Sequence, residues 1–311
     1  MKMKKMKSNH GFLKALPFLA PSLAGLILFS IIPIFASLLI SLTSWTGMSR
    51  VSLFNGFFGF VKKNFVGLEN YRNILSGDEV WRVLGHNAYF IILYLPLMLI
   101  LSLLVASIIH HKSRFAGKYR VMYYIPVLTS WVAGALIWKW LLSPEYGPIN
   151  NALAFFGIEG PLWLQSEVWA MPSIALASVW KDMGFYGMIL LAGLCGINPE
   201  YYEAAAIDGA GRWRKFTHIT LPMLSPTLFY VIMLSLINAF QIFPQIMVMT
   251  KKGEAGPNGA TMVMVERVYK YAFRYGKMGY ATAYSWILFA VVFAFTILQN
   301  KLQKRWVNYD A

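Results

Sequence analysis

The stretch NPEYYEAAAIDGAGRWRKFTHITLPMLSP, residues 198–226, is the longest polar run between two hydrophobic segments in the second half of the chain. Asn198 is a good helix N-cap and Pro199 a good first helical residue, so a short helix is expected from there to Gly209. Gly209 and Gly211 should end this helix. A second short amphipathic turn is expected before Pro222 opens the next hydrophobic segment. The stretch is therefore predicted to fold as helix, kink and helix.

The side chains of this stretch are suited to contact with another protein. Ala204 and Ala205 would allow close approach of a partner surface. Glu203, Asp208 and Arg212 offer charges that could set the register of such a contact. An ordinary solvated loop is the alternative, and composition alone does not separate the two interpretations.

The rest of the chain is dominated by long uncharged runs. Of 311 residues, 58% are hydrophobic and 13% charged, and the mean hydropathy is +0.52, which is too apolar for a soluble domain of this size. A hydrocarbon core of about 30 Å needs about 20 helical residues. The runs long enough to cross it are residues 16–43, 87–109, 121–142, 171–195, 222–249 and 281–299. The predicted fold class is an all-α integral membrane protein with six transmembrane helices.

The segments outside these runs are assigned to the two sides of the membrane by their basic residues. Lysine and arginine are more numerous in the tail 1–15 and in the alternate segments that share its side than in the segments opposite. This bias places both termini in the cytoplasm. Residues 196–221 then form a cytoplasmic loop, residues 250–280 an extracytoplasmic loop, and residues 300–311 a cytoplasmic C-terminal tail. The membrane domain comprises residues 16–299.

The first run and the net charge of +15 each have a second interpretation. The first run is about twice as long as the apolar part of a secretory signal and lacks a convincing cleavage site, so we expect it to be retained. The net charge is attributed to topology and to contact with anionic lipid headgroups. Nucleic acid is not expected as a partner, because no soluble basic domain is present to hold it.

The fourth run contains Lys181 and Asp182, the residue types least expected inside a membrane. An ionisable side chain there is costly unless it faces a cavity or a partner, so both are functional candidates. Adjacent residues on a helix do not face each other, and we therefore expect no simple ion pair between them. Asp182 and Tyr186 are four residues apart and share a helical face.

The fifth run places Asn238, Gln241 and Gln245 at positions i, i+3 and i+7, a polar stripe on one face of a helix. Amides next to aromatic residues suit a polyhydroxylated ligand, because they bond its hydroxyls while the rings cover its C–H faces. A kink at Pro244 favours a cavity beside the stripe. The alternative is that these amides only join helices to one another. A ligand pathway is predicted at Asp182, Tyr186, Asn238, Gln241 and Gln245.

The outer loop at residues 250–280 begins rich in glycine and then becomes amphipathic. Apolar residues recur at helical spacing, among them Val265, Val268 and Phe273, against Lys270 and Arg274. We expect this segment to rest on the membrane surface or to meet an extracytoplasmic partner.

Motifs for catalysis are missing from the sequence. It contains no GxxxxGK[ST] phosphate loop, no GxSxG elbow and no HExxH metal motif, and its one cysteine, Cys195, cannot form an internal disulfide. No catalytic and no metal-binding residue is therefore predicted. If transport is powered, another chain must supply the energy.

The stretch quoted first carries a family resemblance. Glu203-Ala204-Ala205, three residues, Gly209, nine residues, Ile219, one residue and Leu221-Pro222 match the signature of binding-protein-dependent ABC importer permeases, with Asp208 completing the DGA of the carbohydrate branch. Other stretches resemble sugar permeases related to the maltose, lactose and glycerol-phosphate systems: FVGLENYRNIL (65–75), RVMYYIPVLTSWVAGALIWKWLLSPEYGPINNAL (120–153), NAFQIFPQIMVMT (238–250) and GYATAYSWILF (279–289). One departure is that the usual TxGGP reads Thr250, Lys251, Lys252, Gly253.

The resemblance implies a type I importer core of six helices. It implies that the loop 196–221 docks in a groove of an ATPase subunit, with Glu203 as the charged contact, Ala204 and Ala205 as the close-packed face and Gly209 as the turn. It also implies a second, related permease subunit, two ATPase subunits that bind ATP and magnesium, an extracytoplasmic solute-binding protein and a saccharide substrate. The chain itself is expected to hold no cofactor and to lie in the cell membrane.

Two other classes remain open at this point. A secondary transporter driven by protons or sodium would use Lys181 and Asp182 as a coupling-ion site, but no inverted repeat is detectable. A membrane sensor would bind a sugar without transporting it. The charge of the saccharide also stays open, because Lys181 and the basic outer loop would suit an acidic sugar.

Overall fold

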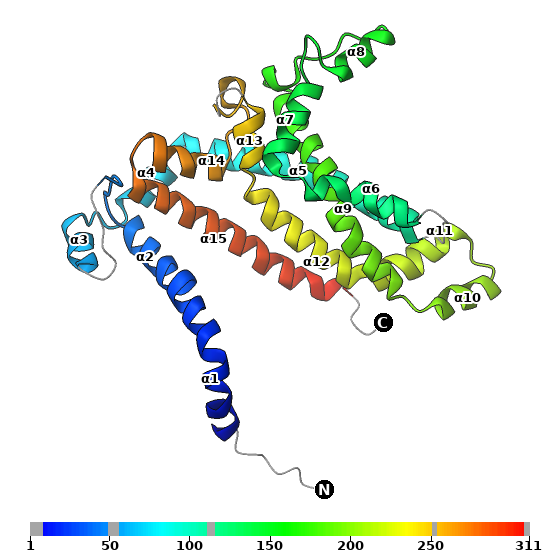
Figure 1. Cartoon of the computed structure of the whole chain (residues 1–311), viewed down its shortest axis with the longest axis horizontal. Helices are drawn as coiled ribbons and strands as arrows, with labels where there is room; N and C mark the ends of the chain where they lie inside the picture. Colours follow the sequence, from blue (N-terminus) through cyan, green and yellow to red (C-terminus); the bar gives the residue numbers. More distant parts are fainter. Residues whose placement is uncertain (1–8, 49–55, 111–115, 251–253, 308–311) are drawn as a thin grey trace. The chain divides into compact units, whose positions relative to one another are not determined.

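The computed structural model describes residues 9–48, 56–110, 116–250 and 254–307. These residues are helical and contain no β-strand, apart from one isolated bridge between Thr43 and Phe65 (Figure 1). Five helices of the described part are long and apolar enough to cross a membrane, and two shorter helices that meet at 98° make a sixth, broken span. The predicted all-α membrane fold is therefore confirmed. Most of the basic tail lies outside the described residues.

The chain divides into two compact units. The first unit contains the described residues up to Ile74 and the segment Tyr269–Trp286. Its elements are α1 (Asn9–Leu26), a π-helical turn (Ile27–Ile31), α2 (Ile32–Ser41), α3 (Phe57–Lys63), nearly all of α4 (Glu69–Ser76), a second π-helical turn (Lys270–Arg274) and the start of α15 (Met278–Leu302). Asn70 joins these pieces, because its buried amide nitrogen donates to the carbonyls of Ser41 and Thr43 at 2.8 and 2.9 Å.

The second unit contains Leu75–Val268 and the rest of α15. Its α-helices are α5 (Asp78–His110), α6 (Ala116–Leu128), α7 (Trp131–Leu141), α8 (Pro148–Phe155), α9 (Ala170–Cys195), α10 (Pro199–Ile207), α11 (Arg212–Lys215), α12 (Leu221–Phe240), α13 (Pro244–Met249) and nearly all of α14 (Met264–Tyr269). A π-helical turn (Phe216–Thr220) and 3-10 turns at Trp163–Gln165, Pro257–Gly259 and Gln303–Arg305 complete it. Helix α9 packs against α5, α6 and α12, so it is the central helix of this unit.

Glycines on α9 allow its neighbours to approach closely. A Cβ atom at Gly184 would lie 2.0 Å from the carbonyl oxygen of Tyr123 on α6. A Cβ atom at Gly193 would lie 2.6 Å from the hydroxyl of Thr227 on α12. Close packing over small residues is the usual basis of helix association in membranes, where no hydrophobic effect drives helices together. The position of α9, and of the polar residues it carries, is thus set by these contacts.

Two of the predicted spans are broken rather than continuous. In the third span, α6 ends at Leu128 and α7 begins after Ser130, whose hydroxyl caps the new helix by accepting from the backbone N–H of Ala133 at 3.2 Å. In the fifth span, α12 ends at Phe240 and α13 begins at Pro244. Proline has no N–H to donate and its ring clashes with the carbonyl four residues earlier, here that of Phe240. The kink predicted at Pro244 is therefore a full break between α12 and α13, and a second break, which the sequence pattern does not predict, divides the third span.

At two other prolines the helix continues through a π-helical turn and does not break. The π-helical turns Ile27–Ile31 and Phe216–Thr220 lie just before Pro33 and Pro222. In the second turn, the N–H of Leu221 reaches back to the carbonyl of Phe216, five residues earlier, so the helix continues past the proline. A continuous helical path therefore runs from Arg212 to Phe240. Pro222 lies in the first turn of the hydrophobic helix α12, as expected, and the short turn before it joins that helix without a break.

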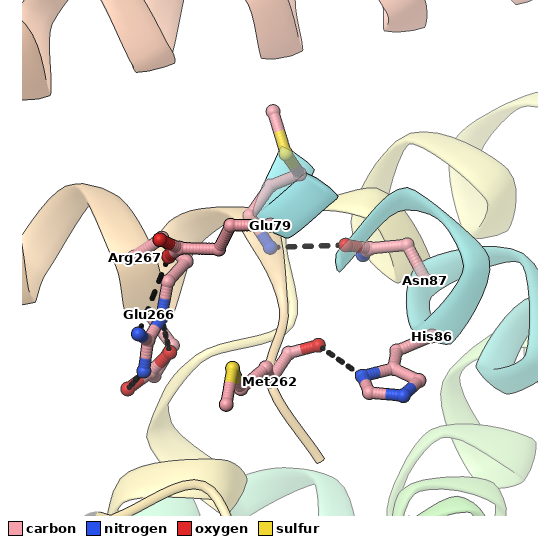
Figure 2. A network of polar contacts seen from close by, with 7 residues as sticks. Glu79, His86, Asn87, Met262, Glu266 and Arg267 are labelled. Atoms are coloured by element: carbon pink, nitrogen blue, oxygen red, sulfur yellow. Dashed lines mark hydrogen bonds and ion pairs between the residues drawn. The ribbon is translucent and has the colours of Figure 1, made fainter. Parts of the chain in front are cut away.

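The outer loop contains a buried ion network instead of a simple amphipathic helix (Figure 2). Arg267 donates to both carboxylate oxygens of Glu266 at 2.7 and 2.9 Å, and to Glu79 of α5 at 3.3 Å. The pKa of Arg267 is raised, because burial, which alone lowers it, is outweighed by the bonds and charges of Glu266 and then Glu79. Lys270 is buried as well, whereas Phe273 is 70% exposed. The predicted division of this loop into apolar and basic faces is thus wrong.

Candidate functional site

A polar cavity of about 300 Å³ lies in the second unit, beside the break between α12 and α13. Its lining comes from α5, α7, α9, α12, α13 and the residues between the last two. The lining residues are Phe90, Tyr94, Trp131, Ser178, Asp182, Asn238, Ala239, Gln241, Ile242, Pro244 and Gln245. An aromatic and amide-rich lining that also holds a carboxylate is the composition of a small-molecule site.

Asp182 is held at the cavity wall by a residue of α5. The hydroxyl of Tyr94 donates to the Asp182 Oδ2 atom at 2.8 Å. The ring of Tyr94 stacks on that of Phe90, with ring centroids 5.3 Å apart and an interplanar angle of 12°. The carboxylate therefore has a fixed orientation next to a flat apolar surface.

The amides of the fifth span lie on both sides of the helix break. Asn238, near the end of α12, donates from its side-chain nitrogen to the Tyr186 hydroxyl at 3.0 Å. Gln245, in the first turn of α13, donates to the Ser178 hydroxyl at 3.4 Å. Its Oε1 atom is buried without a hydrogen-bond partner, which leaves an acceptor at the cavity that a ligand donor can satisfy.

Lys181 has a structural position instead of a place in the cavity lining. Its Nζ atom donates to the carbonyl oxygens of Pro126, Val127 and Thr129 at 3.0, 3.2 and 2.7 Å, and it lies 5.3 Å from the ring centroid of Trp131. A cation is favourable at the carbonyl end of a helix. Lys181 thus caps the C-terminal end of α6 at the break.

The structure brings together most of the residues predicted for the ligand pathway. Asp182, Asn238, Gln241 and Gln245 line the same cavity, although not as one stripe on a continuous helix. Tyr186 is buried behind the lining and contacts it through Asn238. Sequence reasoning missed Phe90, Tyr94, Trp131 and Ser178. The aromatic pair Phe90 and Tyr94, four residues apart in a mostly aliphatic run, was the available signal.

The loop at residues 196–221 has the predicted helix, turn and helix (Figure 1). The side chain of Asn198 caps α10 by accepting from the backbone N–H of Glu200 at 3.0 Å. At the other end, Ala210 N–H donates to the carbonyl of Ala205 at 2.8 Å, and Gly209 N–H to that of Ala206 at 3.1 Å. These two bonds form a Schellman motif. Gly209 has the left-handed conformation that this motif needs, with φ of 73°.

The surface of this loop is apolar as well as charged. Ile207 and Trp213 are 88% and 75% exposed, and Glu203, Ala204 and Asp208 are exposed beside them. Ala205, Ile219, Leu221 and Pro222 are half-buried. The Tyr202 hydroxyl lies 3.0 Å from that of Thr220, which ties α10 to the start of the long helix. Large exposed apolar side chains on a rigid, capped turn are typical of a protein contact.

Comparison with known proteins agrees with this architecture. Residues 76–308 match the family described as "Binding-protein-dependent transport system inner membrane component". The Bacillus subtilis protein named "Probable ABC transporter permease protein YesP" is 33% identical over 99% of this chain and 96% of its own length. The Thermococcus litoralis "Trehalose/maltose transport system permease protein MalF" is 33% identical, with coverage of 97% and 96%. The Rhizobium radiobacter "Lactose transport system permease protein LacF" is 30% identical, with coverage of 91% of each chain.

Among solved structures, a chain of a bacterial ABC transporter that imports the acidic polysaccharide alginate superposes with a TM-score of 0.79. The two chains are 22% identical, and the match covers 96% of this chain and 98% of the other. A second structure, of the alginate transporter with an alginate pentasaccharide-bound periplasmic protein, gives the same TM-score at 21% identity. At this identity the likeness concerns the fold, which is that of an ABC importer permease.

The helical membrane fold and the capped loop define a membrane-spanning transport subunit. The chain belongs to the family of binding-protein-dependent transport system inner membrane components. It is therefore a permease subunit that depends on a binding protein and lies in the inner membrane. Of the TxGGP-like segment, Lys251, Lys252 and Gly253 lie outside the described residues.

Proposed function

We propose that this permease subunit imports a saccharide and that the substrate passes through the cavity at the α12–α13 break. The observation that carries the proposal is the Gln245 Oε1 atom, a buried acceptor without a partner at a cavity that also presents Asp182 and two further amides. Hydroxyl groups both donate and accept, so a polyhydroxylated ligand can satisfy these groups together. The rings of Tyr94 and Trp131 would cover its apolar C–H faces.

The names of related proteins support the same substrate class. The relatives from Rhizobium radiobacter and Thermococcus litoralis are named for lactose and for trehalose and maltose. A Streptomyces coelicolor relative, 30% identical over 91% of this chain and 80% of its own length, is named "Diacetylchitobiose uptake system permease protein NgcF". These substrates are small saccharides rich in hydroxyl groups, which suits the amide-rich lining.

We also propose that the loop at residues 196–221 docks on a separate ATPase. In this account Glu203 makes the charged contact, Ala204 and Ala205 form the close-packed face, and Asp208 and Gly209 hold the turn. Ile219, Leu221 and Pro222 lie where the loop enters the long helix. ATP and magnesium would bind to two ATPase subunits, and a second, related permease subunit would complete the pathway.

The long helix offers a mechanical link between loop and cavity. The path from Arg212 to Phe240 is continuous, and an α-helix rises about 1.5 Å per residue, so it spans roughly 40 Å. Asn238 lies near one end of this path and α11 at the other. A movement imposed on α11 by an ATPase would therefore shift Asn238 relative to α9, which is the basis of alternating access in this proposal.

The proposed orientation places both termini and the loop 196–221 in the cytoplasm. The loop 250–280 then lies outside, where a solute-binding protein delivers the saccharide. The bias of basic residues supports this orientation, and the exposed apolar side chains of Ile207 and Trp213 suit a partner on the cytoplasmic side.

The cavity assignment is tested with the double variant Asn238→Ala/Gln241→Ala in the assembled complex with its ATPase and binding protein. We expect normal assembly but loss of saccharide uptake and of substrate-stimulated ATP hydrolysis. The matched control is Asn300→Ala, which removes an exposed amide from the end of α15 and should change neither activity. Uptake and stimulation that stay unchanged in the double variant would show that this cavity is not the pathway.

A further inference from the structure

Asp182 is the one charged residue in the described lining of the cavity. Among the residues that the structure describes, no lysine, arginine or histidine lines this cavity, and Asp182 is its only carboxylate. Lys181, next to Asp182 in sequence, directs its Nζ atom to the carbonyls at the end of α6, of which that of Thr129 is the nearest at 2.7 Å. A ligand in the cavity thus meets a negative group from this wall and, within the described lining, no positive group to balance it.

Asp182 and Gln245 bring hydrogen-bond acceptors to the lining of the cavity. One N–H of the Gln245 Nε2 atom donates to the Ser178 hydroxyl, while the Oε1 atom of the same side chain is buried and unpartnered. The Ser178 hydroxyl itself donates to the carbonyl of Ile174 at 2.8 Å. The Tyr94 hydroxyl is used by Asp182. The Asp182 carboxylate and the Gln245 Oε1 atom thus bring oxygen lone pairs to this side of the cavity, and these need a hydrogen from the ligand.

A neutral sugar and an acidic sugar differ in how they meet these acceptors. A sugar hydroxyl can donate to Gln245 Oε1 and to Asp182. A carboxylate or phosphate group can only accept, so next to these atoms it would lose its hydration without a hydrogen bond in return. It would also be repelled by the Asp182 charge in a partly desolvated site, where charges interact more strongly than in water.

We propose that this cavity takes an uncharged saccharide unit and discriminates against units that carry a carboxylate or phosphate. The inference rests on the proposed function of the cavity and adds the charge class of the substrate. The fold does not decide this point, because the structures of the same fold at 22% and 21% identity come from a transporter of the acidic polysaccharide alginate. Asp182 and Gln245 discriminate against the charged saccharide units, while Lys181 donates to backbone carbonyls at the end of α6 and does not line the cavity.

The test measures binding to the assembled permease–ATPase complex without the binding protein, so that the selectivity of the binding protein does not enter. Radiolabelled maltose, lactose and trehalose are compared by equilibrium dialysis with the same disaccharides carrying a 6-carboxylate. We expect the uncharged member of a pair to bind more tightly by on the order of tenfold or more. Asp182→Asn should reduce this preference severalfold, and Gln245→Glu, which adds a carboxylate of similar size, should increase it.

The possible results distinguish saccharide binding by the cavity from its selectivity for uncharged units. If Asp182→Asn does not assemble, the preference of the wild-type complex and its increase in Gln245→Glu still decide the matter. If the acidic disaccharides bind as tightly as the neutral ones, saccharide binding stands and the charge selectivity is contradicted. Preferential binding of a 2-amino sugar over its neutral parent would contradict the assignment to uncharged units in the same way. If no saccharide binds, the proposed function of the cavity fails, and this inference fails with it.

Discussion

The hydroxyl of Tyr94 on α5 donates a 2.8 Å hydrogen bond to the carboxylate of Asp182 on α9. The bond joins two helices that pack along each other, and it does so at the wall of the polar cavity. It fixes the orientation of the only carboxylate in the described lining.

Tyr94→Phe removes this bond and keeps the ring that stacks on Phe90. A hydrogen bond to a charged group contributes about 2 kcal/mol, so we expect weaker saccharide binding together with a modest loss of stability. Binding by equilibrium dialysis and the thermal midpoint of the complex measure the two effects. Tyr89→Phe, at a position on the same helix that is 42% exposed, is the control and should change neither quantity. Unchanged binding in Tyr94→Phe would show that the orientation of Asp182 does not matter for the ligand.

Lys181→Met tests the break between α6 and α7. The substitution keeps an extended side chain but leaves the carbonyls of Pro126, Val127 and Thr129 without their donor, at a cost on the order of 3 kcal/mol. We expect a lower thermal midpoint and a smaller yield of assembled complex. Lys62→Met, at an exposed position on α3, should leave both unchanged. A variant as stable as the wild type that lost transport alone would instead indicate a direct role for Lys181 in the substrate or ion pathway.

Gly209→Ala tests the turn of the docking loop. Gly209 has a φ of 73° and open space where a Cβ atom would lie, so the cost of alanine is conformational, about 1 kcal/mol. We expect a less well-formed turn and a reduced ratio of transport to ATP hydrolysis. Gly211→Ala is a matched control, because Gly211 also has open space around it but lies at φ of −69°. Equal coupling in both variants would contradict a role for the turn geometry.

Arg267→Leu tests the ion network of the outer loop. Glu266 is fully buried and receives two hydrogen bonds from Arg267, so the substitution would leave a buried carboxylate without these bonds. Breaking a buried pair from one side costs about 3 to 5 kcal/mol. We expect a strong decrease in the thermal midpoint, whereas Arg72→Leu at an exposed position of α4 should have little effect. Partial recovery in Arg267→Leu/Glu266→Gln, which removes the buried negative charge, would identify that charge as the cause.

Much of the fold could be predicted from the sequence, because long apolar runs and basic flanks act locally. The capped helix at Asn198 and the turn at Gly209 were also predictable, since each depends on a few neighbouring residues. The break after Leu128 was not predictable, whereas the break after Phe240 was predicted as a kink at Pro244. A proline can break a helix, or the helix can continue past it through a π-helical turn, as at Pro222. Which of the two occurs depends on the packing around the proline.

The candidate site was predictable only in part for the same reason. Asp182 and the three amides were conspicuous, because polar residues are rare in such runs. Tyr94 was not, because its role comes from a contact across 88 positions of the chain. Lys181 is equally conspicuous in the sequence, yet its partners are backbone carbonyls, which have no sequence signature. The buried pair of Glu266 and Arg267 was likewise hidden by a pattern that suggested a solvated basic face.

Saccharide uptake by proteoliposomes that contain this chain, its partner permease and the ATPase, with the binding protein outside, tests the proposed import most directly. We expect that accumulation requires both ATP and the binding protein and that collapse of the proton and sodium gradients leaves it unchanged. Uptake that continues without ATP and stops when those gradients are removed would contradict it, and would indicate a secondary transporter.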